Sequence, residues 1–313
     1  MLIGVACGGA AVEPGALAYA LLHPATGGDV ATIVWQLRVP RVAIAATVGA
    51  SLALAGTLLQ ALLRNPIVDP YLTGVASGAG VSIAIAATIG LSPVLIPPLG
   101  FASGLATAVL VAVLARRGPR LDAERLVLAG VSLSALLSAV ITLAIERLAG
   151  GNANVAILAW LAGSLAGRSW NELAAAAPEA IAGAIVAAAT IPALNVLRLG
   201  EGRAAALGVD VTRLQWALLI AVTLLTASAV ALAGLVGFVG LVVPHLARRV
   251  VGPDLRALVP AAVLVGAALV VLADALARTL AAPAEIPLGV LLAFVGVPTF
   301  LVLYLRGAAR GYA

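Results

Sequence analysis

Long apolar stretches, separated by short polar ones, run along nearly the whole chain. In the clearest of them, 38–63, 22 uncharged residues separate Arg41 from Arg64. At 1.5 Å per residue they form a helix of about 33 Å, long enough to cross a bilayer core of about 30 Å. The pattern predicts an all-α fold, a polytopic transmembrane helical bundle of nine or ten spans. The other predicted spans are 71–91, 99–115, 124–145, 174–196, 214–233, 235–250, 258–278 and 287–305.

The stretch 38–63 also contains small and polar residues, which a position facing lipid would not favour. Small residues let neighbouring helices approach closely, and a glutamine needs a hydrogen-bonding partner inside the bundle. We therefore expect this helix at the centre of the bundle, with the other spans packed around it. The residues concerned are Gly49, Ser51, Gly56, Thr57 and Gln60.

Two stretches depart from this pattern. Residues 1–13 are apolar but shorter than the about 20 residues that a span needs, so we expect nine full spans and a stub. The segment 150–172 is polar at its ends and amphipathic in its middle. It is typical of a surface or re-entrant helix, with Trp160 and Trp170 as interfacial anchors.

Composition excludes a soluble protein. Hydrophobic residues make up 63% of the 313 residues and charged residues 10%, whereas soluble domains carry about 25% charged residues. The net charge of +5 comes from arginines that lie between apolar spans. This distribution indicates determinants of membrane topology, and not nucleic-acid binding. The single cysteine, Cys7, excludes an intrachain disulfide.

All 18 basic residues are arginines, so the chain contains no lysine. A nucleotide-binding P-loop needs a lysine that reaches the phosphates, and this chain cannot form one. If ATP drives its activity, the ATPase must be a separate polypeptide. We therefore expect no cofactor in this chain, with ATP and magnesium bound by that partner.

The arginines also predict the orientation, because cytoplasmic loops of membrane proteins carry an excess of positive charge. With the C-terminus in the cytoplasm, thirteen arginines lie inside and five outside. The inside set is Arg64, Arg116, Arg117, Arg120, Arg125, Arg198, Arg203, Arg213, Arg248, Arg249, Arg256, Arg306 and Arg310. The outside set is Arg38, Arg41, Arg147, Arg168 and Arg278.

Several motifs, in a fixed order, resemble one family of membrane proteins. R-V-P-R at 38–41 is followed by G-A-S-L-A-L-A-G at 49–56, Q-A-L-L-R-N-P-I-V-D-P at 60–70 and G-V-A-S-G-A-G at 74–80. A second block comprises G-L-V-G-F-V-G-L-V-V-P-H-L-A-R-R at 234–249, L-A-D-A-L-A-R at 272–278 and E-I-P-L-G-V at 285–290. The chain resembles the permeases that import ferric siderophores, haem and cobalamin, which are the membrane halves of type II ATP-binding-cassette importers.

The resemblance implies one transmembrane permease domain, 1–313, in a bacterial or archaeal cytoplasmic membrane. It implies an inverted-repeat fold, and the match between 51–56 and 229–234 is compatible with such a repeat or with chance. The partners implied are a second copy of the chain, two ATPase subunits, a periplasmic or lipid-anchored substrate-binding protein and membrane lipid.

The resemblance also assigns roles to particular residues. It places coupling helices in the cytoplasmic segment 198–213, seated on the ATPase, and we expect two short helices there. The matching residues are Glu201, Gly202, Ala204, Leu207 and Gly208. It further implies that Arg38, Arg41 and Arg278 receive acidic side chains of the binding protein. Without the resemblance, Arg278 would pair with Asp274 one turn earlier, and the other two would reach lipid headgroups.

A stripe of small residues follows one face of the span 124–145. Gly130, Ser134, Ser138 and Thr142 recur at every fourth position. Taken alone, such a stripe favours close helix packing. The resemblance instead implies a wall of the translocation pathway along the dimer axis.

Two other function classes fit the sequence less well. An ion-coupled secondary transporter usually needs an ionisable residue near the midplane, whereas most charges here lie at span edges. An intramembrane enzyme would need a catalytic dyad or an H-E-x-x-H motif. His245 has no cysteine or acidic pair at zinc spacing, so we expect a structural hydrogen bond and no metal. No residue identifies a particular chelate.

Overall fold

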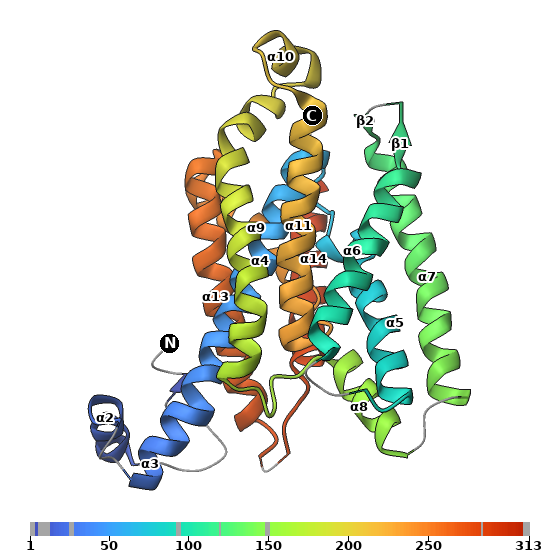
Figure 1. Cartoon of the computed structure of the whole chain (residues 1–313). Coiled ribbons are helices and arrows are strands. Elements are labelled where there is room, and N and C mark those ends of the chain that lie inside the picture. The colour runs from blue at the N-terminus through green and yellow to red at the C-terminus, as the bar shows by residue number, and fades with distance from the viewer. Residues whose placement is uncertain are drawn as a thin grey trace.

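The structure is a computed structural model that describes residues 4–5, 13–24, 28–91, 95–118, 120–147, 151–282 and 284–308. Helices run along one long axis and form a bundle (Figure 1). We call one end of the bundle the α10 end, since it carries α10 and a β-hairpin, and the other the α8 end, which carries α2, α3 and α8. The chain is a polytopic helical bundle, as predicted.

The described elements have the following bounds. They are α2 (Pro14–Leu22), α3 (Gly28–Thr32), the π-helix η1 (Ile33–Arg38), α4 (Val39–Leu63), the 3₁₀-helix η2 (Pro70–Thr73), α5 (Val75–Thr88), α6 (Ile96–Leu114), β1 (Arg116–Arg117), β2 (Arg120–Leu121), α7 (Ala123–Arg147), α8 (Gly151–Ala162), α9 (Trp170–Leu197), α10 (Glu201–Ala206), α11 (Val211–Ala233), α12 (Val239–Val251), α13 (Leu255–Thr279) and α14 (Leu288–Ala308). The two strands form an antiparallel hairpin in which Arg116 pairs with Leu121.

The chain supplies the ends of several long helices with local caps. Ser169 and Glu172 form a capping box at the start of α9, where the Glu172 carboxylate accepts the Ser169 backbone N–H at 2.9 Å. Asp210 and Asp254 accept backbone N–H groups at the starts of α11 and α13. The cap of α9 lies at the α8 end and those of α11 and α13 at the α10 end (Figure 1), so they fix where connections at both ends pass into long helices.

The helix α4 is the centre of the bundle, as predicted. It packs against α9, α11, α12 and α13, and most of its residues are buried. A Cβ atom on Gly49 would lie 2.1 Å from the Gly266 oxygen of α13, and one on Gly56 would lie 2.0 Å from the Gly240 oxygen of α12. Backbones approach this closely only where no side chain intervenes, which explains the small residues of α4.

Two of the predicted spans are shorter than expected. The span 71–91 is α5, with 14 residues, and the span 235–250 is α12, with 13 residues. At 1.5 Å per residue they measure about 20 Å and cannot cross a bilayer core alone. The chain breaks where Pro70 opens η2 and where Phe238 takes a left-handed conformation with φ of 68°.

The N-termini of these two half-length helices meet inside the bundle. The Tyr71 hydroxyl donates to the Val236 carbonyl at 3.1 Å and accepts the Val236 N–H at 3.0 Å. A Cβ on Gly240 would lie 2.6 Å from Pro70. From this meeting point α5 runs to the α8 end (Figure 1), and α12 runs along the last part of α4, where Arg248 contacts Gln60.

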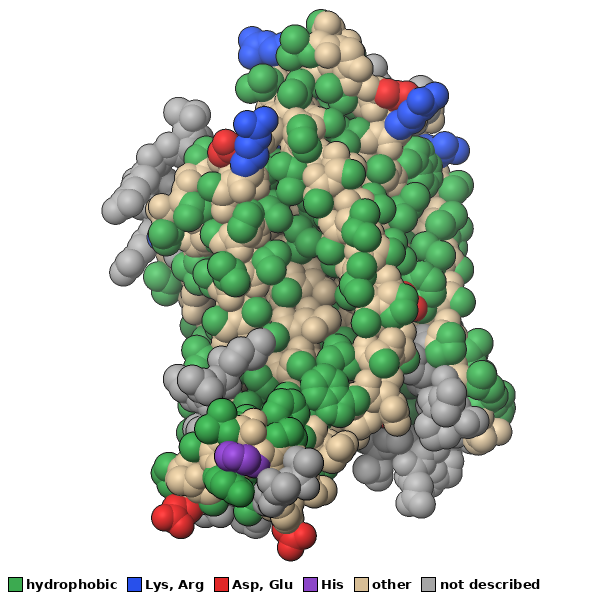
Figure 2. Space-filling model, turned by 60° about the vertical axis from the view of Figure 1, so that its left-hand side comes forward, with side chains coloured by type: hydrophobic (Ala, Val, Ile, Leu, Met, Phe, Trp, Pro, Cys, Tyr) green, Lys and Arg blue, Asp and Glu red, His purple; other side chains and the backbone are tan. Residues whose placement is uncertain are grey.

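Length and apolarity make five helices of the described residues candidate membrane spans: Gly28–Leu63, Glu124–Glu146, Trp170–Leu197, Val211–Ala233 and Leu255–Thr279. Shorter apolar helices cover Val75–Ala86, Pro98–Leu114 and Leu288–Val302. The flank between the two ends is covered mainly by hydrophobic side chains (Figure 2). The predicted stub at 1–13 lies largely outside the described residues.

Candidate functional site

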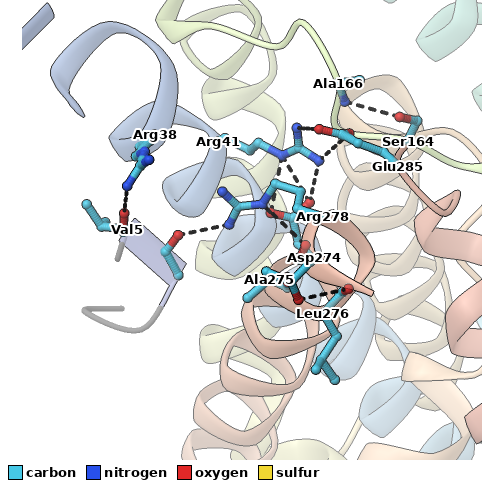
Figure 3. Close-up of polar contacts among 12 residues, drawn as sticks. Val5, Arg38, Arg41, Ser164, Ala166, Asp274, Ala275, Leu276, Arg278 and Glu285 are labelled. Atoms are coloured by element: carbon cyan, nitrogen blue, oxygen red, sulfur yellow. Dashed lines mark hydrogen bonds and ion pairs between the residues drawn. The ribbon is translucent and has the colours of Figure 1, made fainter. Parts of the chain in front are cut away.

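A cluster of charged side chains joins α4, α13 and the connection to α14 at the α8 end (Figure 3). The Arg41 guanidinium lies between two carboxylates. On one side its Nη2 is 2.9 Å and its Nε 3.0 Å from Asp274 Oδ1. On the other, Nη1 is 3.0 Å from Glu285 Oε1 and Nη2 is 2.9 Å from Glu285 Oε2. Arg41 therefore makes paired, charge-assisted hydrogen bonds to both acids, the stronger kind of polar contact.

The other two arginines of the cluster reach inward as well. Arg278 Nε is 3.1 Å from Asp274 Oδ2, so the pair that the residues alone suggest within this helix is present. Arg278 Nη2 also donates to the Gly4 carbonyl at 2.8 Å, and Arg38 Nη1 donates to the Val5 carbonyl at 2.9 Å. Main-chain oxygens of residues 4–5 thus lie against this end of α4 and α13.

Burial within the cluster is uneven. The side chains of Asp274 and Arg278 are 1% and 5% exposed, and that of Arg41 is 13% exposed, whereas Glu285 is 40% exposed. Removing one partner of a buried pair leaves an uncompensated charge, which costs far more than the intact pair contributes. The cluster is therefore a fixed joint with one accessible member, Glu285. That these arginines receive a partner protein stays a prediction.

The predicted coupling segment stands clear of the bundle at the α10 end (Figure 1). It contains one short helix, α10, and not the two that we expected, because α11 already begins at Val211. Gly208 closes α10 with φ of +84°. Its N–H bonds to the Ala205 carbonyl and that of Val209 to the Ala204 carbonyl, both at 3.0 Å. This is a Schellman closure, in which a left-handed glycine is the usual residue.

The predicted coupling residues divide between anchoring and exposure. Ala204 is fully buried, while Leu207 is 68% exposed. Within the part of the chain that the structure describes, a Cβ built on Gly202 or Gly208 would meet no atom within 4 Å beyond the adjoining backbone. Glu201, in the first turn of α10, is half-buried. The segment therefore presents an apolar side chain and bare backbone to its surroundings, while Ala204 ties it to the bundle.

The small-residue stripe of α7 passes from a buried to an open environment. Gly130 is buried, and a Cβ there would lie 1.7 Å from the Leu72 oxygen. Ser134 is half-buried, and Ser138 and Thr142 are exposed. The Thr142 hydroxyl donates to the Ser138 carbonyl of its own helix at 3.0 Å. One end of the stripe thus serves packing against η2, and the side chains at the other end are exposed.

An open groove lies between the end of α4 and the start of α7. Its volume is about 360 Å³, and it is lined by Leu63, Asn65, Val68, Glu124, Val127 and Leu128. Asp69 follows Val68 in the non-helical connection from α4 to η2 and accepts the Tyr71 N–H at 2.9 Å. Burial raises the pKa of Asp69 to about 6, although the hydrogen bond from Tyr71 opposes that rise.

Gln60 has the interior partners that its position in α4 predicted. Its amide nitrogen is 3.1 Å from the Gly240 oxygen, and Arg248 donates to its Oε1 at 3.2 Å. The prediction for Trp160 is wrong: its indole Nε1 is buried in the bundle, and its ring would touch a Cβ on Gly80. His245 Nε2 is buried without a partner among the described residues, so the expected hydrogen bond is not found at that atom.

The sequence interpretation missed Glu179. It lies nine residues into the 28-residue helix α9 and is half-buried. Nine residues correspond to about 14 Å along the axis, so this carboxyl group is not at a span edge. The signal was visible in the sequence, because Glu179 is the one acidic residue of the predicted span 174–196. An ionisable group at such depth is a functional candidate in its own right.

Comparison with known proteins yields matches over the whole chain. Residues 1–306 match the model of the FecCD transport family. The chain is 42% identical to the cobalamin import system permease protein BtuC of Halobacterium salinarum, over 87% of this chain and 73% of that protein. It is 37% identical to the hemin transport system permease protein HmuU of Yersinia pestis, over 98% and 93%. A solved structure described as an inward-facing metal-chelate type ABC transporter aligns with a TM-score of 0.82 and 35% identity, over 88% of each chain.

Proposed function

The chain belongs to the FecCD transport family, and from that premise we propose that it is the membrane-spanning permease subunit of an ATP-driven metal-chelate importer. The observation that carries the proposal is the agreement of sequence and fold over the same residues. The family match spans 1–306, and the structural alignment to a metal-chelate type transporter covers 88% of the chain. In this role the chain is a transport subunit and not an enzyme.

The proposed substrate is haem, a ferric siderophore or cobalamin. The relatives named above carry cobalamin and hemin in their names, and a third, at 37% identity, is an Fe(3+)-citrate import permease of Bacillus subtilis. All of these are large metal chelates. The exposed part of the α7 stripe, Ser138 and Thr142, offers small hydroxyl groups and little that would recognise one chelate.

The proposed complex contains two copies of this chain, two ATPase subunits and a substrate-binding protein. The absence of lysine from the chain requires a separate ATPase, which would bind ATP and magnesium. We place the α10 end, with the C-terminus, in the cytoplasm, since the predicted orientation puts thirteen of eighteen arginines on that side. The α8 end would then face the binding protein.

The test of this function is purification of the tagged full chain from its own membranes in mild detergent. We expect an ATPase subunit to copurify, and the complex to hydrolyse ATP while the stripped chain does not. In vesicles, the complex with its binding protein should accumulate one of three offered chelates: haemin, cyanocobalamin or ferric citrate. ATP hydrolysis by the stripped chain, or uptake that needs no ATP, would contradict the proposal.

The coupling role of 198–213 has a sharper test at Gly208. Valine is strained at φ of +84°, whereas asparagine tolerates that conformation, and neither side chain meets another atom at its Cβ. We expect Gly208→Val to abolish transport with normal expression and normal association of the binding protein, and Gly208→Asn to retain most transport. Wild-type transport by Gly208→Val would make the segment a plain connector.

The alternative, an ion-coupled secondary transporter, now has one observation in its favour, the carboxyl group of Glu179 inside α9. Coupling to an ion would require it to gain and lose a charge in each cycle. Uptake by Glu179→Gln separates the two. We expect that variant to transport at close to the wild-type rate, and loss of uptake with intact ATP hydrolysis would favour ion coupling.

A further inference from the structure

We propose that Glu285 is the internal competitor of the binding protein: it occupies Arg41 in the free permease, and an acidic side chain of the docking partner replaces it. The proposal rests on the proposed function, which supplies the docking partner. It adds a positioning residue on the connection from α13 to α14. The observation behind it is the gradient of exposure, since Glu285 is 40% exposed while Asp274, the other acid on Arg41, is 1% exposed.

Exchange is possible at Glu285 and not at Asp274. Asp274 is held by Arg41 and by Arg278, at 2.9 and 3.1 Å, and it lies within a helix. Glu285 lies in a non-helical connection, and its hydrogen bonds in this cluster go to Arg41 alone. If Glu285 leaves, Arg41 keeps one buried carboxylate and does not become an uncompensated charge. The exchange therefore leaves the joint between α4 and α13 intact.

The charge balance favours an acidic replacement. Among the described residues of the cluster, three arginines, Arg38, Arg41 and Arg278, face two carboxylates, which gives a formal net charge of +1 (Figure 3). Departure of Glu285 raises that charge to +2, at the edge where the cluster is most exposed. A carboxylate from another protein restores the balance and inherits a preorganised fork of two N–H donors.

The exchange would be transmitted to α14. This helix begins at Leu288, three residues after Glu285, and Leu288 is 2% exposed. The connection is tied to α13 by the Ile286 N–H, which donates to the Ala277 carbonyl at 3.0 Å, and to α4 by Glu285. Release of Glu285 removes the tie to α4 and keeps the tie to α13. The first turn of α14 then keeps its ties to α13 and to Gly163, whose carbonyl accepts the Gly289 N–H at 3.4 Å, and loses the tie to α4. This is how docking at the α8 end would reach the helix.

The experiment uses the full chain in nanodiscs and hexaglutamate peptide as the probe. A nitroxide label at Ala284, an exposed position beside Glu285, is introduced as Ala284→Cys in a Cys7→Ser background. In the chain with native Glu285, we expect saturating peptide to make the label more mobile at low salt. High salt should abolish that change, because exposed charges are then screened. In Glu285→Gln the label should already be mobile, and peptide should change it little.

Peptide affinity gives the second readout, with a matched control at Glu146, an acid near the end of α7. We expect Glu285→Gln to bind hexaglutamate about tenfold more tightly than wild type, Glu285→Asp to bind close to wild type, and Glu146→Gln to be unchanged. An equal gain in peptide affinity in Glu146→Gln would show that the gain reflects general surface charge. No gain in affinity in Glu285→Gln would contradict the proposal that Glu285 competes with the partner.

The label experiment with native Glu285 does not depend on the variants folding. A label that stays immobile at saturating peptide would overturn the exchange by itself. Because neither readout requires ATP or a chelate, failure of uptake in the complex would contradict the proposed function and leave the exchange standing. Uptake by the complex with no change in label mobility would contradict the exchange and leave the proposed function standing.

Discussion

α4 and α7 look alike in sequence and occupy opposite environments. Each has 25 residues, and each carries small residues along one face. In the most apolar 18-residue stretch, 83% of residues are buried for the span containing α4 and 17% for α7. Gly49 and Gly56 of α4 meet the backbones of α13 and α12, whereas Ser138 and Thr142 of α7 are exposed.

This contrast shows that a stripe of small residues predicts a close contact but does not identify the neighbour that provides it. For α4 the contacts come from later helices of the same chain. For α7 the remaining candidates are lipid or, under the proposed function, a second copy of the chain. Around the exposed part of the stripe, Leu136 and Leu143 are also more than half exposed, so this face has the composition of a surface that needs an apolar neighbour.

The largest expected effect is at Gly56 of α4. Gly56→Leu would drive a side chain into the Gly240 backbone, whose oxygen would lie 2.0 Å from the new Cβ. Since that backbone belongs to a packed helix, we expect a loss of about 3 kcal/mol or more, enough to prevent a stable fold. Size-exclusion profile and thermal unfolding in detergent measure it. Wild-type stability would mean that α4 and α12 are not in contact.

A smaller loss is expected at Gln60. Gln60→Leu leaves the Gly240 carbonyl without this donor and Arg248 without this acceptor, at a cost of about 1–2 kcal/mol. The matched change on α7 is Thr142→Val, which removes a hydroxyl that donates to the Ser138 carbonyl of its own helix. Thermal unfolding should separate the two variants. Equal midpoints would erase the distinction between the two helices.

The stability of the chain should depend on pH through Asp69, which follows Val68 of the groove. Burial raises the pKa of Asp69 from 3.8 to about 6, so the folded chain binds this proton more tightly than the unfolded chain. Stability should therefore fall as pH rises from about 4 to 6, by about 1 kcal/mol once partial exposure is considered. Asp69→Asn should remove that dependence, and Glu124→Gln on the α7 side should keep it. Unfolding midpoints from about pH 4 to 7 test this.

The smallest effect on the isolated chain is expected from Ser138→Leu on α7. Because Ser138 is exposed, its stability should change by no more than about 0.5 kcal/mol. The informative measurement is the mass of the protein in detergent, together with transport. Altered self-association or lost transport, at unchanged stability, would show that a second copy covers this face. If neither changes, this face contacts lipid.

Much of the fold was predictable because local chemistry determines it. Uncharged runs of span length predict the long helices, and Gln60 within such a run predicts a helix buried in the bundle. The spacing of Asp274 and Arg278 suggests an ion pair one turn apart. The left-handed closure at Gly208 was predictable as well, since a glycine followed a short helix-prone run.

What was missed depends on residues far apart in the chain. Arg41 and Glu285 are separated by 244 positions, and no local pattern pairs them. The half-length helices α5 and α12 need Tyr71 to meet Val236, which satisfies backbone groups that neither segment could satisfy alone. Trp170 likewise has a distant partner, because its indole N–H donates to the Trp35 carbonyl, 135 positions earlier in the chain.

The contact between Gln60 and Arg248 also has a consequence for the order in which this protein is synthesised and folded. The two residues are 188 positions apart, and at 5–20 residues per second the ribosome needs roughly 10–40 s to travel from one to the other. During that interval α4 already exists, yet α12 and α13, which fill its glycine faces, do not. The helix that ends up most deeply enclosed is therefore among the first to be made and among the last to find its neighbours. Until then its amide and bare backbone must be sheltered by the insertion machinery or by α9 and α11 as they arrive.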